Sequence, residues 1–375
     1  MSSETLHLRE KLGHLNWLMV LLLIAIALTG GAMLYSVAGG DWDPWARRQL
    51  IRFLPALFLM LAIALTDIRF WLRLAYPIYA GCLVLLVLVA VAGSTGMGGQ
   101  RWLDLGVMRL QPSELTKVGV VLALARYYHG ITQPQSTRLI SLIPPLVIIG
   151  VPVALVAQQP DLGTALMIVA GGVTVIFLAG APAWLFIGGA AAAAAAGPMA
   201  WSFALHDYQR DRVLTFLNPE RDPLGAGYQI LQAKIATGSG GLTGKGFLSG
   251  TQTQLDFLPE MKTDFIFTVL TEELGLVGAG LLLAAYAIVL GYAMAMAFVT
   301  RNHFGRLLTS GLAMTLFLYV LINVAMVTGL VPVVGVPLPM VSYGGSAMLT
   351  MMLAYGLILC VAIHRRLTIP RRGRL

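Results

Sequence analysis

Apolar segments of about bilayer-spanning length recur along the whole chain and constrain its fold more than any other feature. A helix needs about 20 mainly apolar residues to cross the hydrocarbon core. Ten such segments lie at about residues 16–37, 50–65, 74–92, 115–128, 139–157, 164–178, 183–203, 265–298, 307–330 and 347–363. Charged residues make up 11% of the chain, against about 25% in an ordinary soluble domain. The sequence therefore predicts an all-α polytopic membrane protein of about ten transmembrane helices, with residues 1–375 as a single domain.

The distribution of basic residues indicates the orientation of the chain. Ten spans place both termini on one side, and the C-terminal tail carries five arginines: Arg365, Arg366, Arg371, Arg372 and Arg374. Since cytoplasmic segments carry an excess of Lys and Arg, both termini are expected in the cytoplasm. Three arginines violate this rule on the outer side: Arg47, Arg48 and Arg52. Residues 204–263 then form a long extracytoplasmic loop between spans seven and eight.

Polar residues, Gly and Pro are concentrated in four stretches, at 93–114, 158–163, 204–264 and 331–346. In this topology all four emerge on the outer face, whereas the cytoplasmic turns are short and mostly basic. We therefore expect any chemistry on the extracytoplasmic side. The net charge of +8 is explained by the basic turns and by lipid headgroups, so no nucleic-acid partner is expected. No metal-binding spacing of Cys or His is present, and no metal site is predicted from the residues.

Several acidic residues lie at the start of span eight, where acids are costly and usually mark a pathway or a site. Asp264 stands at the outer mouth of this span. It is either a carboxylate that stabilises the helix N-terminus or a functional acid. Glu272 and Glu273 lie about two turns deeper and are expected to form ion pairs, with Lys117 or Arg109 as examples of partners. Glu114 and Lys117 are spaced to pair with each other on span four.

Cations and one tryptophan complete the set of candidate residues. Arg210, Arg212 and Lys245 lie among glycines in the long outer loop, and this combination suits a phosphate group. The alternative is that these side chains only solvate the loop. Trp102 is either an interfacial belt residue or part of a site.

Short motifs in a fixed order are more specific than any of these residues alone. They are GQRWLDLG at 99–106, QPSELTK at 111–117, QPDLGTA at 159–165, YQ at 228–229, GSGGLTGKG at 238–246, GTQ at 250–252, FLPE at 257–260, TDFIF at 263–267, EELG at 272–275 and PMVSYGGS at 339–346. With these motifs the chain resembles the SEDS family (shape, elongation, division and sporulation proteins) over nearly its whole length. The short tails and GVPLP at 335–339 resemble the elongation members more than the division members.

The resemblance implies a glycosyltransferase of the bacterial inner membrane that polymerises lipid II into glycan strands during cell-wall elongation and rod-shape maintenance. Asp264 matches the essential aspartate of the family and would be the general base. Undecaprenyl pyrophosphate would be the leaving group, and its charge needs cations or a divalent ion such as Mg²⁺ or Mn²⁺. The candidate substrate-binding residues are Trp102, Arg109, Lys117, Asp161, Arg210, Arg212, Lys245 and Ser342, and the supporting charges are Glu114, Glu272 and Glu273.

The resemblance also implies partners: lipid II, the nascent glycan strand, a class B penicillin-binding protein that cross-links strands, other wall-elongation proteins and membrane lipids. Two rival functions remain. A lipid II flippase fits a bundle with intramembrane acids, although no inverted repeat is evident and the polar motifs gather on one face. A non-catalytic scaffold would leave the outer charged residues without a chemical role.

Overall fold

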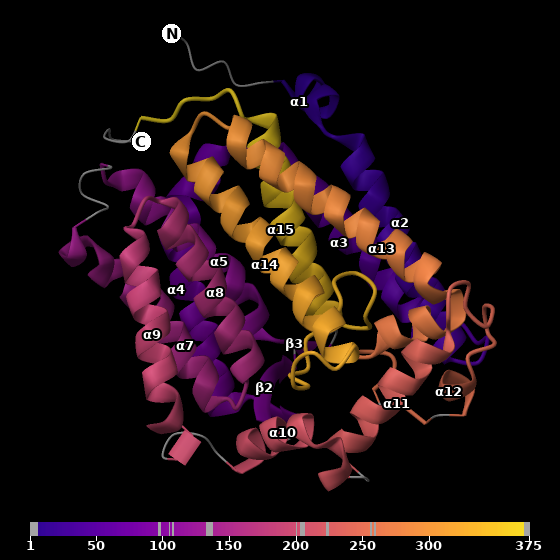
Figure 1. Cartoon of the computed structure of the whole chain (residues 1–375). Helices are drawn as coiled ribbons and strands as arrows, with labels where there is room; N and C mark the ends of the chain where they lie inside the picture. The colour runs from indigo at the N-terminus through magenta and orange to yellow at the C-terminus, as the bar shows by residue number, and fades with distance from the viewer. Residues whose placement is uncertain are drawn as a thin grey trace.

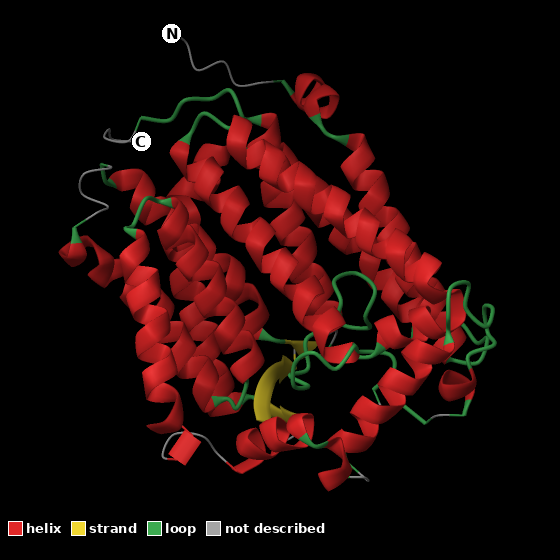
Figure 2. Ribbon diagram, in the orientation of Figure 1, coloured by secondary structure: helices red, strands yellow, loops and turns green. Residues whose placement is uncertain are grey.

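Long helices lying side by side form most of the chain in the computed structural model (Figures 1 and 2). The structure describes residues 7–96, 99–104, 106, 109–132, 138–199, 201–202, 207–222, 225–255, 257–258 and 260–370. The membrane-type helices are α2 (Trp17–Val37), α3 (Ala46–Leu65), α4 (Ile68–Ala92), α5 (Pro112–Gly130), η1 (Leu139–Leu142) with α7 (Ile143–Gln158), α8 (Leu162–Leu178), α9 (Ala183–Met199), α13 (Ile266–Val299), α14 (His303–Val327) and α15 (Gly345–Ile363).

Each expected span coincides with one of these helices. Among the described residues, seven helices are long and apolar enough to cross a membrane: α2, α3, α4, η1 with α7, α13, α14 and α15. Helices α8 and α9 are apolar but shorter. The prediction of an all-α polytopic membrane protein is confirmed, and the count of ten spans stays a prediction.

Helix α5 is the least apolar of the set because it faces other helices instead of lipid. It packs against α4, α7, α8 and α14, and most of its side chains are buried. Pro112 occupies its first turn, where a missing N–H costs nothing. The N-cap is Gln111, immediately before Pro112.

The polar stretches contain the remaining elements. Residues 93–114, expected as a loop, include a small antiparallel sheet of β1 (Ser94–Gly96), β2 (Gly99–Asp104) and β3 (Arg109–Leu110), with Leu103 opposite Leu110 (Figure 2). The long segment before α13 contains α10 (Asp207–Leu217), η3 (Pro219–Arg221), α11 (Ala226–Ser239) and α12 (Thr251–Gln254). Within residues 227–236 the apolar residues have the spacing of a helix, and this stretch lies in α11.

The bundle has two different ends. Helix α1 (Leu8–His14) and the C-terminal end of α15 lie at one end, whereas the strands and α10, α11 and α12 lie at the other (Figure 1). The four polar stretches therefore gather at one end, as the span count predicts. That this end faces the outside of the cell stays a prediction.

Helix α13 is broken at Gly275, whose backbone angles (φ 65°, ψ −163°) are not helical. The outer loop fills the break: the N–H groups of Lys245 and Gly246 donate to the carbonyls of Glu272 and Glu273, each over 3.0 Å. A Cβ at Gly275 would lie 2.3 Å from the backbone N of Gly244, so only glycine fits here. Irregular backbone at this depth is satisfied because protein surrounds it.

Candidate active site

Asp264 lies immediately before α13, at the end of the bundle where the polar stretches meet. The N-cap of α13 is Phe265. Among the described residues, no donor makes a hydrogen bond to the Asp264 carboxylate, whereas its backbone carbonyl accepts one from Asn323. Asp264 therefore does not cap the helix, and its carboxylate is available for another role.

The backbone around Asp264 is held by the connection between α14 and α15. The Asn323 amide donates to the carbonyl of Asp264 over 2.9 Å and to that of Val336 over 2.7 Å. The Ser342 hydroxyl donates to the carbonyl of Thr263. Because these bonds involve main-chain atoms, they fix the position of Asp264 without neutralising its carboxylate.

The surroundings of the Asp264 carboxyl favour its neutral form. Burial raises the pKa of Asp264 to about 6, the nearby Glu260 carboxylate raises it as well, and the Arg212 guanidinium opposes both effects. Gly335 lies against the carboxylate, since a Cβ there would be 3.4 Å from Asp264 Oδ2. A carboxylate with a pKa near 6 is still ionised at neutral pH and is a stronger base than an ordinary aspartate.

Arg212, on α10, is the predicted cation that acts on Asp264. Its Nη1 donates to the carbonyl of Val333 over 3.3 Å, two residues before Gly335. No carboxylate among the described residues lies within ion-pair distance of it, so its charge is not cancelled by the protein. Arg210, on the same helix, instead lies 3.7 Å from Asp207 and donates to the carbonyl of Ser202.

Lys117 does not reach the surface. Its Nζ lies 2.7 Å from Glu114 Oε1, and the two side chains are only 1% and 5% exposed. The ammonium also lies 4.2 Å from the centre of the Tyr319 ring, and the Tyr319 hydroxyl donates to Glu114. The predicted local pair is confirmed, and burial keeps Lys117 away from a ligand at the surface.

Glu272 is surrounded by donors from the outer loop. Its carboxylate pairs with Lys245 over 2.7 Å and accepts bonds from the Thr251 hydroxyl, the Gln252 N–H, and both the N–H and hydroxyl of Thr253. Lys245 is thus already neutralised inside the protein.

Glu273 accepts a hydrogen bond from the Ser36 hydroxyl of α2. Arg109 lies 3.8 Å from Asp104 in an exposed pair across β2 and β3. The expected partners of Glu272 and Glu273, Lys117 and Arg109, are therefore wrong, because each of those cations pairs with an acid close to it in sequence.

Two other predicted residues hold the polar stretches together. Asp161 caps α8 by accepting from the Thr164 N–H over 3.2 Å, and it also accepts from the Gln111 side chain over 3.1 Å. Ser342 fixes the backbone at Thr263, as described above. Trp102 lies on β2 and is half-buried, and its contribution to binding stays a prediction.

Asn323, Glu260 and Gly335 also belong to this site, although they were not among the predicted site residues. Asn323 could have been found as a polar residue inside an apolar span, because an amide buried in a bundle needs partners. Its amide nitrogen has two, but its Oδ1 is buried without one in the described part of the chain. Gly335 gives no such signal, because its role depends on close approach to a residue far away in sequence.

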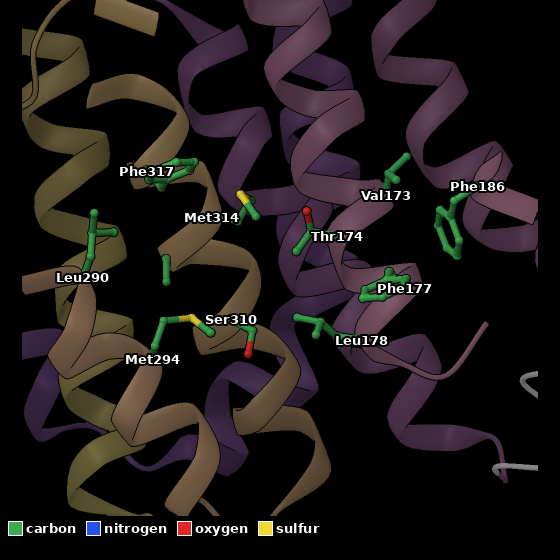
Figure 3. A pocket seen from close by; sticks show the side chains of 11 residues that line it. Val173, Thr174, Phe177, Leu178, Phe186, Leu290, Met294, Ser310, Met314 and Phe317 are labelled. Atoms are coloured by element: carbon green, nitrogen blue, oxygen red, sulfur yellow. The ribbon is translucent and has the colours of Figure 1, made fainter. Parts of the chain in front are cut away.

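An apolar pocket of ≈ 540 Å³ lies elsewhere, between α8, α9, α13 and α14 (Figure 3). Its lining residues are Val173, Thr174, Phe177, Leu178, Phe186, Leu290, Met294, Ser310, Ala313, Met314 and Phe317. The two lining residues on α13, Leu290 and Met294, lie in its C-terminal half, whereas Asp264 precedes the N-terminus of α13. This pocket has no charged lining residue and is not where sugar or pyrophosphate chemistry would occur.

No cluster of three or more His, Cys, Asp or Glu that could hold a metal ion occurs within the described ranges. Near Asp264, two carboxylates are available, those of Asp264 and Glu260. Magnesium in phosphate-handling sites is commonly held by one or two carboxylates together with substrate phosphates. The residues present thus fit a divalent ion that arrives with a pyrophosphate, and do not form a closed metal site.

The sequence matches the model of a known protein family. The family model described as "Cell cycle protein", which covers FtsW, RodA and SpoVE, matches residues 13–367. The chain belongs to this family. The SEDS resemblance of its motifs is therefore confirmed.

Individual members of the FtsW/RodA/SpoVE family are similar over almost the full length. Peptidoglycan glycosyltransferase MrdB of Escherichia coli K12 is 45% identical over 355 residues, which are 94% of this chain and 95% of MrdB. A chain in a structure of a peptidoglycan synthase complex, described as coordinating polymerization and crosslinking, has a TM-score of 0.81 at 34% identity, covering 94% of this chain and 98% of that one. Rod shape determining protein RodA of Thermus thermophilus has a TM-score of 0.70 at 30% identity, covering 94% and 97%.

Proposed function

We infer that this chain is a peptidoglycan glycosyltransferase that acts in cell-wall elongation and the maintenance of cell shape. Its family membership and its similarity to MrdB and RodA support the activity. The observation that carries the mechanism is the carboxylate of Asp264. It has no donor among the described residues, a pKa raised to about 6, and a backbone fixed by Asn323.

Asp264 is the general base of the proposed reaction. Its carboxylate takes the proton from the 4-hydroxyl of the acceptor sugar while that oxygen attacks the anomeric carbon of the donor. The bond between the anomeric carbon and the pyrophosphate oxygen breaks, and undecaprenyl pyrophosphate leaves with the electron pair. The proton stays on Asp264 until it passes to solvent. Repetition of this step with lipid II lengthens the glycan strand.

Arg212 neutralises the charge that develops on the leaving pyrophosphate. It is the one candidate cation whose charge acts on Asp264, and it is free of a carboxylate partner in the described part of the chain. Lys117 and Lys245 are already paired with Glu114 and Glu272. A divalent ion such as Mg²⁺ or Mn²⁺, bound with the pyrophosphate near Asp264, would add further positive charge.

The proposed setting is the outer face of the bacterial inner membrane, where the polar stretches meet and the lipid tails of the substrates stay in the bilayer. The cross-linking partner is a class B penicillin-binding protein. A synthase complex that coordinates polymerization and crosslinking contains a chain similar to this one, and this supports the pairing. Other wall-elongation proteins and membrane lipids complete the expected environment.

Polymerisation of lipid II by the purified chain with its transpeptidase partner tests the function. Asp264→Asn should lower the rate by about 10²–10⁴, the usual contribution of a general base, while the melting temperature stays the same. Glu220→Gln, which changes an exposed acid on the same outer segment, should leave the rate unchanged. Full activity of Asp264→Asn would remove the base assignment.

The two rival functions give different results in the same experiment. Movement of lipid II across vesicle membranes without any glycan product would support a flippase. A partner that makes equal amounts of glycan with and without this chain would support a scaffold.

A further inference from the structure

Two further cations, which lie near the end of the connection between α14 and α15, have no assigned role. Arg52 lies on α3, and its Nη1 donates to the Tyr343 hydroxyl over 3.3 Å, with its guanidinium 5.5 Å from the centre of that ring. The Lys262 ammonium lies 5.1 Å from the centre of the Trp45 ring. Within the described ranges, no carboxylate lies within ion-pair distance of either side chain. Aromatic rings orient a cation without cancelling its charge.

The connection between α14 and α15 contacts the segments that carry both cations. The Tyr343 N–H donates to the Lys262 carbonyl over 2.8 Å. The Gln49 side chain, one turn before Arg52, donates to the carbonyl of Ser342 over 2.9 Å. Both Arg52 and Lys262 are half-buried, so each is partly desolvated without a counter-ion, which is unfavourable unless an anion binds there.

Arg52 packs against glycine backbone, which carries no side chain. Gly344 and Gly345 follow Tyr343, and a Cβ at Gly345 would be 3.5 Å from Arg52 Cδ. At Gly344 the nearest atom to an added Cβ would be 3.9 Å away. Arg52 also lies near the outer end of α3, at headgroup depth in the expected topology. Its violation of the rule for basic residues then has a reason, since an anionic ligand would hold it there.

The connection between α14 and α15 thus carries cations at both ends. Arg212 contacts Val333 near its start, and Asp264 lies against Gly335. Arg52 contacts Tyr343 near its end. We propose that Arg52 and Lys262 bind the pyrophosphate of the acceptor lipid, while Arg212 serves that of the donor. This proposal rests on the function proposed above.

The chemistry of the two substrates explains the separation. The donor pyrophosphate is attached to the carbon that is attacked, so it must lie beside Asp264. The acceptor hydroxyl belongs to the far sugar of a lipid-linked disaccharide, so its pyrophosphate lies two sugar rings from the reacting oxygen. Two cationic sites at different distances from one base are therefore what this polymerisation needs.

Direct binding tests the site without relying on turnover. The full chain, in nanodiscs of zwitterionic phospholipid, is titrated with undecaprenyl pyrophosphate, and bound lipids are counted by native mass spectrometry. The wild type should bind two, and Arg52→Gln with Lys262→Gln should retain one, with about tenfold weaker binding for each cation removed at the second site. Arg47→Gln is the matched control, because Arg47 lies in the first turn of the same helix but pairs with Asp43 over 3.2 Å.

Two outcomes of this titration would overturn the proposal. Binding of two molecules at wild-type affinity by the double variant would show that these cations are not ligands. Displacement of the second molecule by phosphatidylglycerol in the nanodisc would show a general phospholipid site. Arg52→Lys, which keeps the charge, should retain most of the affinity and shows that the loss does not come from misfolding.

A kinetic measurement separates this proposal from the function itself. In the polymerisation assay, the double variant should raise the KM for lipid II about tenfold or more with a smaller change in kcat. An unchanged KM would overturn the acceptor site and leave Asp264 as the base. If the wild type makes no glycan at all, the proposed function fails, while the binding result is unaffected.

Discussion

Asp264 and Glu272 lie eight residues apart in one acidic stretch, yet their surroundings are opposite. Glu272 is fully buried and receives an ammonium, two N–H groups and two hydroxyls from the outer loop. Asp264 is only half-buried, receives no donor to its carboxylate in the described part of the chain, and lies near the Glu260 carboxylate. A carboxylate whose lone pairs are all used holds structure together, whereas one without donors can accept a proton from a substrate.

The same difference separates the cations. Lys117 and Lys245 each lie 2.7 Å from a glutamate. Arg212, Arg52 and Lys262 contact carbonyls, hydroxyls or rings, which leave their charge available to an anion. Of these five cations, the two that are already neutralised belong to the framework, and the other three are the ones proposed to bind the substrates.

Glu272→Ala should cause the largest loss of stability. It removes the common acceptor of the outer loop and leaves Lys245 without its partner, at a cost of about 3–5 kcal/mol when a buried pair is broken from one side. We expect a lower melting temperature and early protease cleavage in residues 240–254. Glu272→Gln keeps an acceptor oxygen and should lose roughly half as much stability.

Activity measurements on the same variants test whether Glu272 is structural and Asp264 catalytic. If Glu272→Gln stays folded but loses polymerisation to the extent that Asp264→Asn does, Glu272 takes part in the chemistry. The distinction between carboxylates with and without hydrogen-bond donors would then fail. We expect its remaining activity to follow the folded fraction.

Asn323→Leu should have a smaller effect, on kcat more than on stability. The Asn323 amide nitrogen holds the carbonyls of Asp264 and Val336, while its oxygen has no partner within the described ranges. Loss of two hydrogen bonds at about 1 kcal/mol each would let the backbone at Asp264 shift, and we expect kcat to fall about tenfold with the KM for lipid II unchanged. A fall in melting temperature alone, with kcat per folded molecule unchanged, would make Asn323 merely structural.

Much of the fold follows from the sequence because bilayer physics leaves few choices. Each of the ten apolar segments coincides with a helix, and α11 appears where apolar spacing predicts it. The break at Gly275 could not be foreseen, because it depends on backbone contacts with a segment that is distant in sequence. It is stabilised by backbone bonds to Gly241 and Leu242, which lie in a loop about 30 residues earlier in the chain, and local pattern carries no information about such contacts.

The site follows the sequence less closely, for the same reason. The acids and cations were identified as residues, and the pair of Glu114 with Lys117 was predicted because it is local in sequence. The long-range partner was not: Glu272 pairs with Lys245 and not with Lys117. Family motifs single out Asp264, whereas Asn323, which holds its backbone carbonyl, becomes visible only when distant segments are brought together.

The smallest expected effect is a shift in the pH dependence of kcat/KM. It tests Asp264 by removing two neighbouring charges of opposite sign, one at a time. Because Asp264 must be ionised to accept a proton, kcat/KM should fall as the pH drops below about 6, the pKa of this carboxyl. Glu260→Gln removes a negative neighbour, lowers the pKa of Asp264 and should move this fall to lower pH. Arg212→Gln removes a positive neighbour and should move it to higher pH, by on the order of half a pH unit in each case. Glu220→Gln should leave the pH at which kcat/KM falls unchanged. Profiles that stay unchanged in both charge variants would mean that the titrating base is not Asp264, and the contrast between its open carboxylate and the enclosed one of Glu272 would then have no catalytic meaning.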